Sequence, residues 1–334
     1  MKESKNILIT LDYELFLGAK SGDYTHCILE NTQKLIRLFE RQAIRNAIFF
    51  VDCAYMAKLK SNSKVAACAI AYQQICDQLR ELLNSGHYIF PHIHPHWLDA
   101  KWGEQSQNWE LNNLSRYRLQ SLDDDTLEDI IDQSVEFLRT EIGVQGDLGY
   151  RAGGWCIQPF DSLAKSFKKN HIKYDFSVVP GRYNSAEDQY YDFRNAPKKD
   201  FYRFSTEPAT EDPTGDFVEV PISSLAFSKA TKRNDLVRRL YFKLIDNPYT
   251  RGMGARFSSG GTTNHESMMV SIEDFFFPLQ PELKKMLKQE TTLQFIGHPK
   301  LFTSTNLRNF ERFIIHARSN YRVNFDFLSI LNPS

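Results

Sequence analysis

The chain has 334 residues, and its 41 lysine and arginine residues balance 41 aspartate and glutamate residues, so its formal net charge is zero. This balance argues against a protein that binds nucleic acid or an anionic membrane through its overall charge. A hydrophobic content of 42% with 25% charged residues is typical of a globular chain and excludes disorder as its main state.

The sequence indicates neither a signal peptide nor a membrane span. The first apolar run covers only Ile7-Leu8-Ile9, which is shorter than the roughly 7–15 residues of a signal-peptide core. No later stretch approaches the roughly 18 apolar residues of a transmembrane helix.

The five cysteines are scattered and form no Cys-x-x-Cys pair, so neither a disulfide scaffold nor a thiolate zinc site is expected. We expect a cytoplasmic protein, and the sequence leaves its oligomeric state open.

Short apolar runs alternate with helix-periodic segments along the chain. Predicted strands cover residues 7–11, 47–51, 88–90, 148–150, 172–174, 217–221, 293–296 and 323–327. Predicted helices cover residues 27–42, 65–83, 127–142, 159–169, 236–245 and 304–319. This alternation is typical of parallel strands joined by crossover helices, which predicts an α/β fold.

Three irregular stretches complete the prediction. Asp125, with Glu128 three residues on, predicts a capping box at the start of the helix over 127–142. A long loop excursion, rich in Pro, Gly, Asp and Tyr, covers about 180–216. A Gly/Ser/Thr-rich loop covers 251–264. We expect a single catalytic domain over residues 1–334.

Polar side chains follow five of the predicted strands, at the point where each strand ends. In chain order they are Asp12 and Glu14, then His92, His94 and His96, then Arg151, Asp175 and His298. The carboxyl ends of parallel strands meet on one face of a β/α fold, so we expect these side chains to form one site.

His92 and His96 are the expected metal ligands. They are four residues apart, and the prolines at 91 and 95 favour an extended turn over a regular helix. Two imidazoles with a carboxylate from Asp12 or Glu14 make a three-ligand site with open positions for water. His94 has three possible roles, as a third ligand, as a support for the ligands or as an outward-facing side chain, and we expect it not to be a ligand.

These residues resemble the motifs of the polysaccharide deacetylase family, the NodB-homology carbohydrate esterases. Thr10-Leu11-Asp12-Tyr13-Glu14 is similar to its Thr-Phe-Asp-Asp-Gly motif, and His92-Ile93-His94-Pro95-His96 to its paired histidines after a Gly-His lead-in, here Gly86-His87. Arg151-Ala152-Gly153-Gly154-Trp155 loosely matches the third motif, Asp175-Phe176 the fourth and His298 the fifth. The motifs keep the family's order over residues 7 to 300.

The resemblance implies a distorted (β/α) barrel of about seven parallel strands that removes acetyl groups from N-acetylated sugars with a divalent metal. It assigns the following roles: Asp12 is the base, His92 and His96 are metal ligands, Arg151 holds Asp12 ionised, His298 is the acid, and Asp175 orients His298.

The first and third motifs depart from the family pattern. Tyr13 replaces the family's metal-binding Asp, so either Glu14 becomes the ligand or Asp12 itself binds the metal and the base is lost. Residues 12 and 14 share one side of a continuing strand, which makes Glu14 a possible ligand. The third motif lacks its Pro, and Trp155 could form the pocket wall instead. Trp97 and His94 are further candidates for contacts with the sugar.

The resemblance therefore implies a deacetylase of surface polysaccharide biosynthesis. Its substrate would be an N-acylated sugar or a nucleotide- or lipid-linked sugar precursor. Its cofactor would be one divalent ion, zinc or alternatively iron, cobalt or nickel. Two alternatives stay open: a deformylase or cyclic-ureide amidohydrolase on the same barrel, and a non-catalytic barrel that binds carbohydrate.

Overall fold

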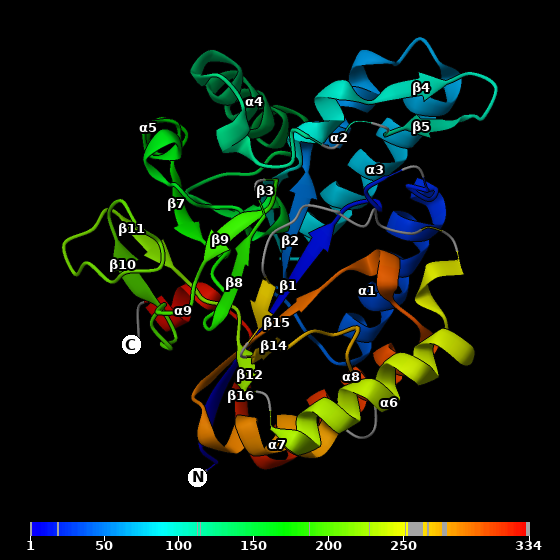
Figure 1. Cartoon of the computed structure of the whole chain (residues 1–334). Helices are drawn as coiled ribbons and strands as arrows, with labels where there is room; N and C mark the ends of the chain where they lie inside the picture. The colour runs from blue at the N-terminus through cyan, green and yellow to red at the C-terminus, as the bar shows by residue number, and fades with distance from the viewer. Residues whose placement is uncertain are drawn as a thin grey trace.

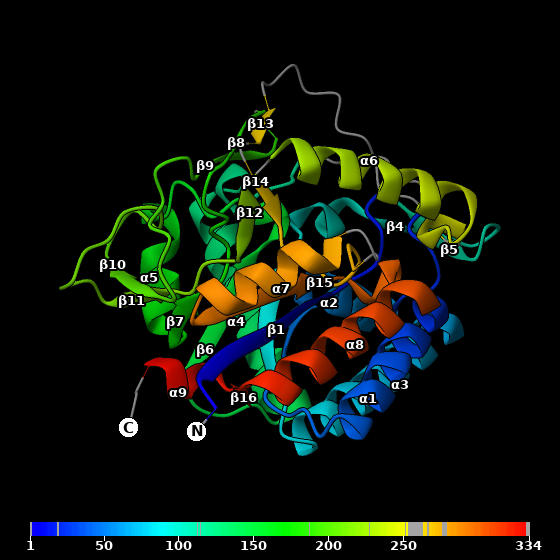
Figure 2. The same ribbon diagram turned by 90° about the horizontal axis from the view of Figure 1, so that it is seen from below.

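The computed structural model describes residues 2–18, 20–111, 113, 115–186, 188–226, 228–250, 252, 263–265, 267–275 and 279–331. They form an α/β fold in which helices surround a mostly parallel sheet, as Figures 1 and 2 show in two views. Among these residues, no helix is long and apolar enough to cross a membrane. Most of the loop predicted over 251–264 lies outside the described residues.

The strands are β1 (Ser4–Tyr13), β2 (Ile48–Asp52), β3 (Tyr88–Ile93), β4 (Lys101–Gly103), β5 (Asn108–Glu110), β6 (Leu148–Ala152), β7 (Ile172–Asp175), β8 (Arg182–Ser185), β9 (Tyr190–Asp192), β10 (Tyr202–Phe204), β11 (Phe217–Glu219), β12 (Ser224–Ala226), β13 (Thr263–His265), β14 (Ser267–Met269), β15 (Thr292–Gly297) and β16 (Arg322–Asn324). The α-helices are α1 (Asn31–Arg41), α2 (Cys53–Ser61), α3 (Ala66–Asn84), α4 (Asp124–Phe137), α5 (Asp161–Lys169), α6 (Lys229–Leu244), α7 (Gln280–Gln289), α8 (Ser304–Asn320) and α9 (Phe327–Leu331).

Seven strands run parallel in the order β15, β1, β2, β3, β6, β7 and β11, and β10 adds an antiparallel edge. β16 pairs with the start of β1. From β1 to β11 the order follows the chain, as in a sheet built from β-α-β units. The parallel sheet of about seven strands is therefore confirmed. Its two edges do not pair within the described residues, so the barrel is not confirmed.

An isolated parallel bridge between Ser271 and Ile296 and a few further hydrogen bonds, rather than a ladder, span the gap between β11 and β15. The Ser223 N–H donates to the Gln294 carbonyl (3.3 Å), and the Ser223 carbonyl accepts from Val270 (2.8 Å). The Ile272 N–H donates to the Ile296 carbonyl (2.8 Å). The segment after β14 thus lies between the two sheet edges, which approach each other without forming a strand pair.

β1 lies inside the sheet, between β15 and β2, because its apolar run leaves neither face to water. Ile7, Leu8, Ile9 and Leu11 are all buried, as expected for a parallel strand covered on both faces. Outside the sheet, α1, α3 and α8 lie together in both views (Figures 1 and 2). Most of the buried hydrophobic residues, from Ile7 to Phe327, form one continuous core.

Most predicted elements are present, with shifts of a few residues. The sequence prediction missed α2, α7, α9 and the short strand pairs β4–β5 and β12–β14. The predicted excursion over 180–216 contains β8, β9 and β10. That the chain is one catalytic domain and that it is cytoplasmic stay predictions.

The strand predicted over 323–327 ends early because the chain turns at Asp326. The Asp326 N–H donates to the Asn324 side chain (3.1 Å), and the Leu328 N–H donates to the Asp326 carboxylate (3.1 Å). Phe327 is then buried against the rings of Phe90 and Tyr88, at centroid distances of 5.9 and 4.9 Å. The C-terminal segment therefore covers the start of β3 rather than extending the sheet.

Helix α4 begins two residues before the predicted capping box. Asp123, not Asp125, is the N-cap, and its carboxylate accepts from the Thr126 N–H (2.9 Å) and hydroxyl (2.8 Å). An N-cap carboxylate satisfies a backbone donor that the helix itself leaves free, so its position decides where the helix starts.

We expect Asp123→Ala to lower Tm by about 2 °C, since a lost N-cap costs a small but measurable part of the stability. Asp125→Ala removes a carboxylate from the same turn without removing the cap, and is the matched control. Thermal unfolding followed by circular dichroism compares the two. A larger decrease in Tm for Asp125→Ala than for Asp123→Ala would favour the capping box at Asp125 that the sequence predicted.

Candidate active site

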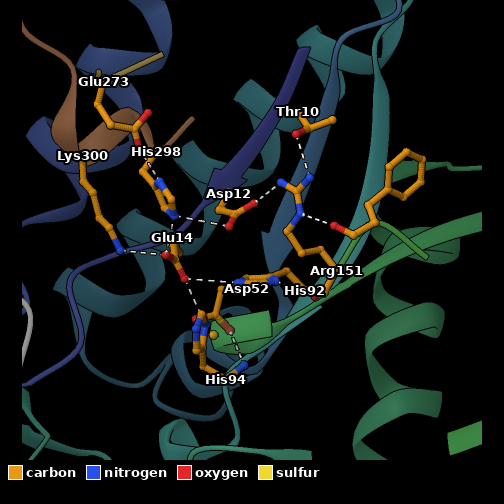
Figure 3. Close-up of polar contacts among 12 residues, drawn as sticks. Thr10, Asp12, Glu14, Asp52, His92, His94, Arg151, Glu273, His298 and Lys300 are labelled. Carbon is orange, nitrogen blue, oxygen red and sulfur yellow. Dashed lines mark hydrogen bonds and ion pairs between the residues drawn. The ribbon is translucent and has the colours of Figure 1, made fainter. Parts of the chain in front are cut away.

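Charged or imidazole side chains gather at the carboxyl ends of the parallel strands (Figure 3). In sheet order these are His298 after β15, Asp12 and Glu14 at β1, Asp52 at β2, His92 and His94 at β3, Arg151 on β6, Asp175 at β7 and Glu219 at β11. The strand register sets Asp52 opposite His92, and His92 opposite Arg151. The strand ends therefore lie on one edge of the sheet, but only some of the expected side chains line one cavity: Asp12, Glu14, His92, His94 and His298 do, whereas His96 and Asp175 do not.

Arg151 is fully buried and hydrogen-bonds to three different partners. Its Nη1 donates to Asp12 Oδ1 (2.7 Å), its Nη2 to Thr10 Oγ1 (2.7 Å) and its Nε to the Phe176 carbonyl (2.9 Å). Burial favours the neutral acid, but the guanidinium and then His298 outweigh it and hold the pKa of Asp12 well below its ordinary value. Asp12 is thus ionised and fixed in orientation.

Three buried ligand atoms converge beside this pair. Glu14 Oε2 lies 3.3 Å from His92 Nε2 and 3.0 Å from His94 Nδ1, and all three residues are buried. Their ligand atoms lie within 4.8 Å of one another, and so do those of Asp12, Glu14 and His298. Both groups share Glu14, which places it at the centre of the site.

A backbone hydrogen bond fixes the tautomer of His92. Its Nδ1 lies 2.6 Å from the Arg151 carbonyl, which can only accept, so Nδ1 carries the proton. Nε2 is therefore the ring nitrogen that faces Glu14 and could bind a metal. This is the arrangement by which proteins orient an imidazole that binds a metal.

The structure brings His94, rather than His96, to Glu14 and His92. His94 is extended (φ −111°, ψ 98°), so it shares a strand face with His92 two residues earlier. A 3-10 turn begins at Pro95 and carries His96 off that face. The four-residue spacing predicts a shared face only for a backbone that stays regular, and here it does not.

His96 is completely buried and lies outside both groups of ligand atoms. Its ring packs near Trp97 and Tyr117, at centroid distances of 5.7 and 6.5 Å. Burial and then the neighbouring His94 lower the pKa of His96 to about 3, so its ring is neutral.

Two glycines after β6 allow the rings of this site to approach the backbone. A Cβ at Gly153 would lie 2.8 Å from the His94 ring and 2.6 Å from the Ile93 carbonyl oxygen. Gly154 has φ +57°, and a Cβ there would lie 2.4 Å from the Tyr117 ring. The Gly-Gly pair is thus required by the packing of His94 and Tyr117.

His298 has a carboxylate on each side. Its Nδ1 lies 2.5 Å from Glu273 Oε1, and its Nε2 lies 3.3 Å from Asp12 Oδ2. Burial disfavours the charged ring, but Glu273 and then Asp12 raise the pKa of His298 to about 10. The ring is therefore protonated at neutral pH, with one N–H directed at Asp12.

The structure does not bring Asp175 to His298. Asp175 ends β7 and accepts from the Ser177 hydroxyl (2.7 Å), and its strand neighbour is Glu219 on β11. Burial and then Asp175 raise the pKa of Glu219 well above its ordinary value, so the structure favours the neutral form of this carboxyl. Asp175 thus belongs to a separate carboxyl pair, and Glu273 occupies the position expected of it.

Lys300 supplies a buried cation that the sequence prediction did not include. Its Nζ donates to Glu14 Oε1 (2.7 Å) and to the Leu15 carbonyl (2.8 Å). Burial would raise the pKa of Glu14, but Lys300, followed by His94 and His92, lowers it well below the ordinary value. Lys300 thus holds one carboxylate oxygen of Glu14 and leaves the other facing the two imidazoles.

Asp52 holds His94 in place through two contacts of its carboxylate. Its Oδ2 lies 3.3 Å from His94 Nδ1 and accepts from the Trp97 indole N–H (2.7 Å). Trp97 is completely buried and packs against Tyr55 at a centroid distance of 4.7 Å. Trp97, a candidate for sugar contacts, is therefore part of the support for His94 and does not line the cavity.

A cavity of about 220 Å³ opens above these groups. Its polar floor consists of Asp12, Glu14, His92, His94, His298 and Lys300, and its walls include the aromatic rings of Phe16, Tyr117, Trp155 and Tyr249. Apolar walls around a few convergent polar groups are typical of small-molecule sites. Trp155, which we considered as a replacement for the missing Pro in the pocket wall, lies in this wall.

The sequence prediction missed three residues of the site, and only two of them are marked by a sequence pattern. Asp52 directly follows a predicted strand, and Lys300 lies two residues beyond His298, so the strand-end rule pointed to both. Glu273 follows no predicted strand, and no local pattern marks it. Only the hydrogen bonds around Ile272 bring it to the end of β15.

No family model matches the chain, and no curated protein matches it. Solved structures do match. A candidate polysaccharide deacetylase of Mycobacterium smegmatis has a TM-score of 0.51 and 14% identity, covering 99% of this chain and 89% of that one. A second candidate polysaccharide deacetylase, of Pseudomonas aeruginosa PAO1, has a TM-score of 0.51 and 12% identity, with coverages of 99% and 90%. The 4-alpha-glucanotransferase of Thermococcus litoralis also has a TM-score of 0.51, at 13% identity, but only 41% of that chain is covered. At such identities the likeness establishes a shared fold.

We expect Arg151→Met to lower the free energy of unfolding by about 3–5 kcal/mol, because it leaves the buried Asp12 carboxylate without its cation while keeping most of the side-chain volume. The double variant Asp12→Asn/Arg151→Met should recover part of this loss. Urea unfolding measures both.

The matched control is Arg41→Met, which removes an exposed guanidinium that also pairs with a carboxylate, Glu311, at 2.9 Å. Surface pairs of this kind contribute about 1 kcal/mol or less. Equal losses for Arg41→Met and Arg151→Met would show that the buried pair is not a special determinant of stability.

Proposed function

We propose that the chain is a metal-dependent amide hydrolase that removes the acetyl group from an N-acetylated sugar. The convergence of Glu14, His92 and His94 carries this proposal, because it lies at the floor of the cavity beside a carboxylate and an imidazole suited to acid–base chemistry. The fold shared with candidate polysaccharide deacetylases supports the same reaction class.

The donor set fits a divalent ion. No hydrogen bond satisfies Glu14 Oε2, His92 Nε2 or His94 Nδ1 within the described part of the chain, although all three atoms are buried. Buried polar atoms without partners are costly, and a cation between them would satisfy all three. Two imidazoles and one carboxylate suit zinc and also iron, cobalt or nickel. Glu14 would then take the place of the family's second Asp.

When bound, a divalent ion supplies a Lewis acid that polarises the amide carbonyl and lowers the pKa of water. Asp12 would accept the proton of the attacking water, since Arg151 keeps its carboxylate ionised and orients it. His298 would then donate its Nε2 proton to the leaving amine. Opposite partners, Arg151 for the base and Glu273 for the acid, keep the two groups in opposite charge states.

The substrate proposal is an N-acylated sugar, free or carried on a nucleotide or lipid, in surface polysaccharide biosynthesis. The aromatic walls of the cavity offer flat apolar surfaces of the kind on which sugar rings can pack. The buried Lys300 ammonium lines the same cavity and adds a donor beside Glu14.

A different acyl group is the nearest alternative, because the same floor of metal ligands, base and acid would serve N-formyl or cyclic-ureide hydrolysis. Incubation with N-acetyl and N-formyl sugars separates these substrates by the acid released, acetate or formate. A protein that binds the sugars and releases neither acid would be a carbohydrate-binding barrel.

We expect the purified protein to hold about one divalent ion per chain. His92→Ala and His94→Ala should each weaken metal binding by at least about 100-fold, since each removes a direct ligand. Elemental analysis and competition with a chelator measure the loss.

His96→Ala is the matched control, because His96 is an equally buried imidazole two residues further on that contacts neither Glu14 nor His92. It should keep the metal. Metal loss in His96→Ala but not in His94→Ala would favour the ligand pair expected from the sequence. A metal-free protein whose stability does not change in His92→Ala would overturn the metalloenzyme proposal.

Glu273→Gln should move the alkaline limb of kcat/KM to lower pH by about 1–3 units. His298 must be protonated to act as the acid, so activity falls as pH rises through its pKa, and loss of the Glu273 charge lowers that pKa. The readout is acetate release from an N-acetyl sugar across a pH series.

Asp175→Asn is the control for this profile, because Asp175 is buried at a neighbouring strand end yet does not contact His298. Its alkaline limb should stay where the wild type has it. If Asp175→Asn shifted the alkaline limb and Glu273→Gln did not, Asp175 rather than Glu273 would be the residue that orients His298.

A further inference from the structure

The face of helix α6 that meets the protein is mostly polar, with the buried Phe242 as its apolar exception, whereas several apolar side chains of the helix are exposed. Asn234 Nδ2 donates to Glu282 Oε1 on α7 (2.9 Å), and Arg238 forms ion pairs with Asp235 and Asp274. A surface helix of a globular protein normally has the opposite arrangement, with its apolar stripe facing the core. On α6 a mostly polar face therefore meets the protein, and all three leucines of the helix are exposed.

The outward face carries a continuous apolar stripe. Leu236, Leu240 and Leu244 follow one another at four-residue spacing, and their side chains are 60%, 50% and 76% exposed. Val237 and Ile245 widen the stripe, at 45% and 72% exposed. Single exposed apolar residues are common, but a contiguous group on one element marks an interaction surface.

Basic residues surround this stripe. Between residues 229 and 244 the sequence contains six lysine and arginine residues and one acidic residue, Asp235. Lys229, Arg233, Arg239 and Lys243 are exposed on the outward side. An exposed apolar stripe with a basic rim is the pattern of helices that lie in the interface of an anionic membrane.

We propose that α6 is an interfacial helix that binds the chain to an anionic lipid surface. The apolar stripe would enter the boundary between headgroups and acyl chains, and the basic rim would contact the negative headgroups. Both views show α6 on the outside of the molecule beside α7 (Figures 1 and 2). A neutral partner protein would account for the stripe but not for the basic rim, so charge complementarity favours the lipid surface.

The position of α6 links this surface to the cavity. The chain leaves α6 at Leu244 and reaches Tyr249 five residues later, and Tyr249 lines the cavity while half of its surface stays exposed. A membrane held by α6 would therefore lie close to the cavity opening. If the proposed function holds, the substrate would be a sugar carried on a lipid.

The test is co-sedimentation of the full chain with vesicles of about one part phosphatidylglycerol to two parts phosphatidylcholine, compared with vesicles of phosphatidylcholine alone. We expect the wild type to bind the anionic vesicles, and Leu236→Ser/Leu240→Ser/Leu244→Ser to reduce binding at least about tenfold. Charge reversal in Lys229→Glu/Lys243→Glu should reduce it comparably and abolish its dependence on phosphatidylglycerol.

Matched controls are Ile70→Ser on α3 and Ile315→Ser on α8, which remove apolar side chains that are 53% and 49% exposed away from α6. They should bind as the wild type does. Wild-type protein that stays in the supernatant, or a triple variant that still sediments, would overturn the proposal. So would a wild-type dimer that the triple variant dissociates without vesicle binding, since the stripe would then join two copies. Vesicle binding requires no turnover, so failure of the proposed hydrolase reaction would leave this result unaffected.

Discussion

The buried guanidinium of Arg151 is the interaction on which the arrangement of the site depends. It belongs to β6, donates to Thr10 and Asp12 on β1, and donates to the carbonyl of Phe176 after β7. Its own carbonyl accepts from His92 on β3. One residue therefore fixes the charge of the proposed base and the tautomer of a proposed metal ligand at once. A buried guanidinium is tolerated only when its donors are satisfied, so the ends of these strands must stay in register around it.

Two other groups of the site are also paired with a residue of opposite charge. In each pair the partner binds one atom of the group, while another atom of the same group faces the cavity. Lys300 holds one oxygen of Glu14, and Glu273 holds the far nitrogen of His298. In each case one atom is occupied and the other is left free for chemistry. Such pairing is how a buried site can keep several ionised groups within a few ångströms of one another. Preorganisation of this kind means that little rearrangement is needed when a substrate binds.

The sequence was sufficient for the parallel sheet and for the strand ends that carry Asp12, Glu14, His92, Arg151 and His298, because apolar runs and the residues that follow them are local signals. It was insufficient wherever the outcome depends on tertiary contacts. The exchange of His96 for His94 depends on the turn that begins at Pro95, and the exchange of Asp175 for Glu273 depends on a chain segment that reaches β15 from β14. Whether the sheet closes into a barrel could not be predicted either, since an isolated bridge and a few hydrogen bonds, rather than a strand pair, span the gap between β11 and β15.

Helix α6 shows that net charge, too, is a weak guide to what a chain can bind. A net charge of zero argued against electrostatic attraction to a membrane, yet it is a sum over the chain and carries no information on where the charges lie. The sequence of α6 contains an amphipathic pattern, but periodicity alone cannot say which face meets the protein. The ion pair between Arg238 and Asp274 and the hydrogen bond between Asn234 and Glu282 decide this, because they hold inward the face that carries Arg238 and Asn234. The apolar stripe and the basic rim then face outward together, and a neutral chain presents a locally cationic, hydrophobic surface beside the cavity.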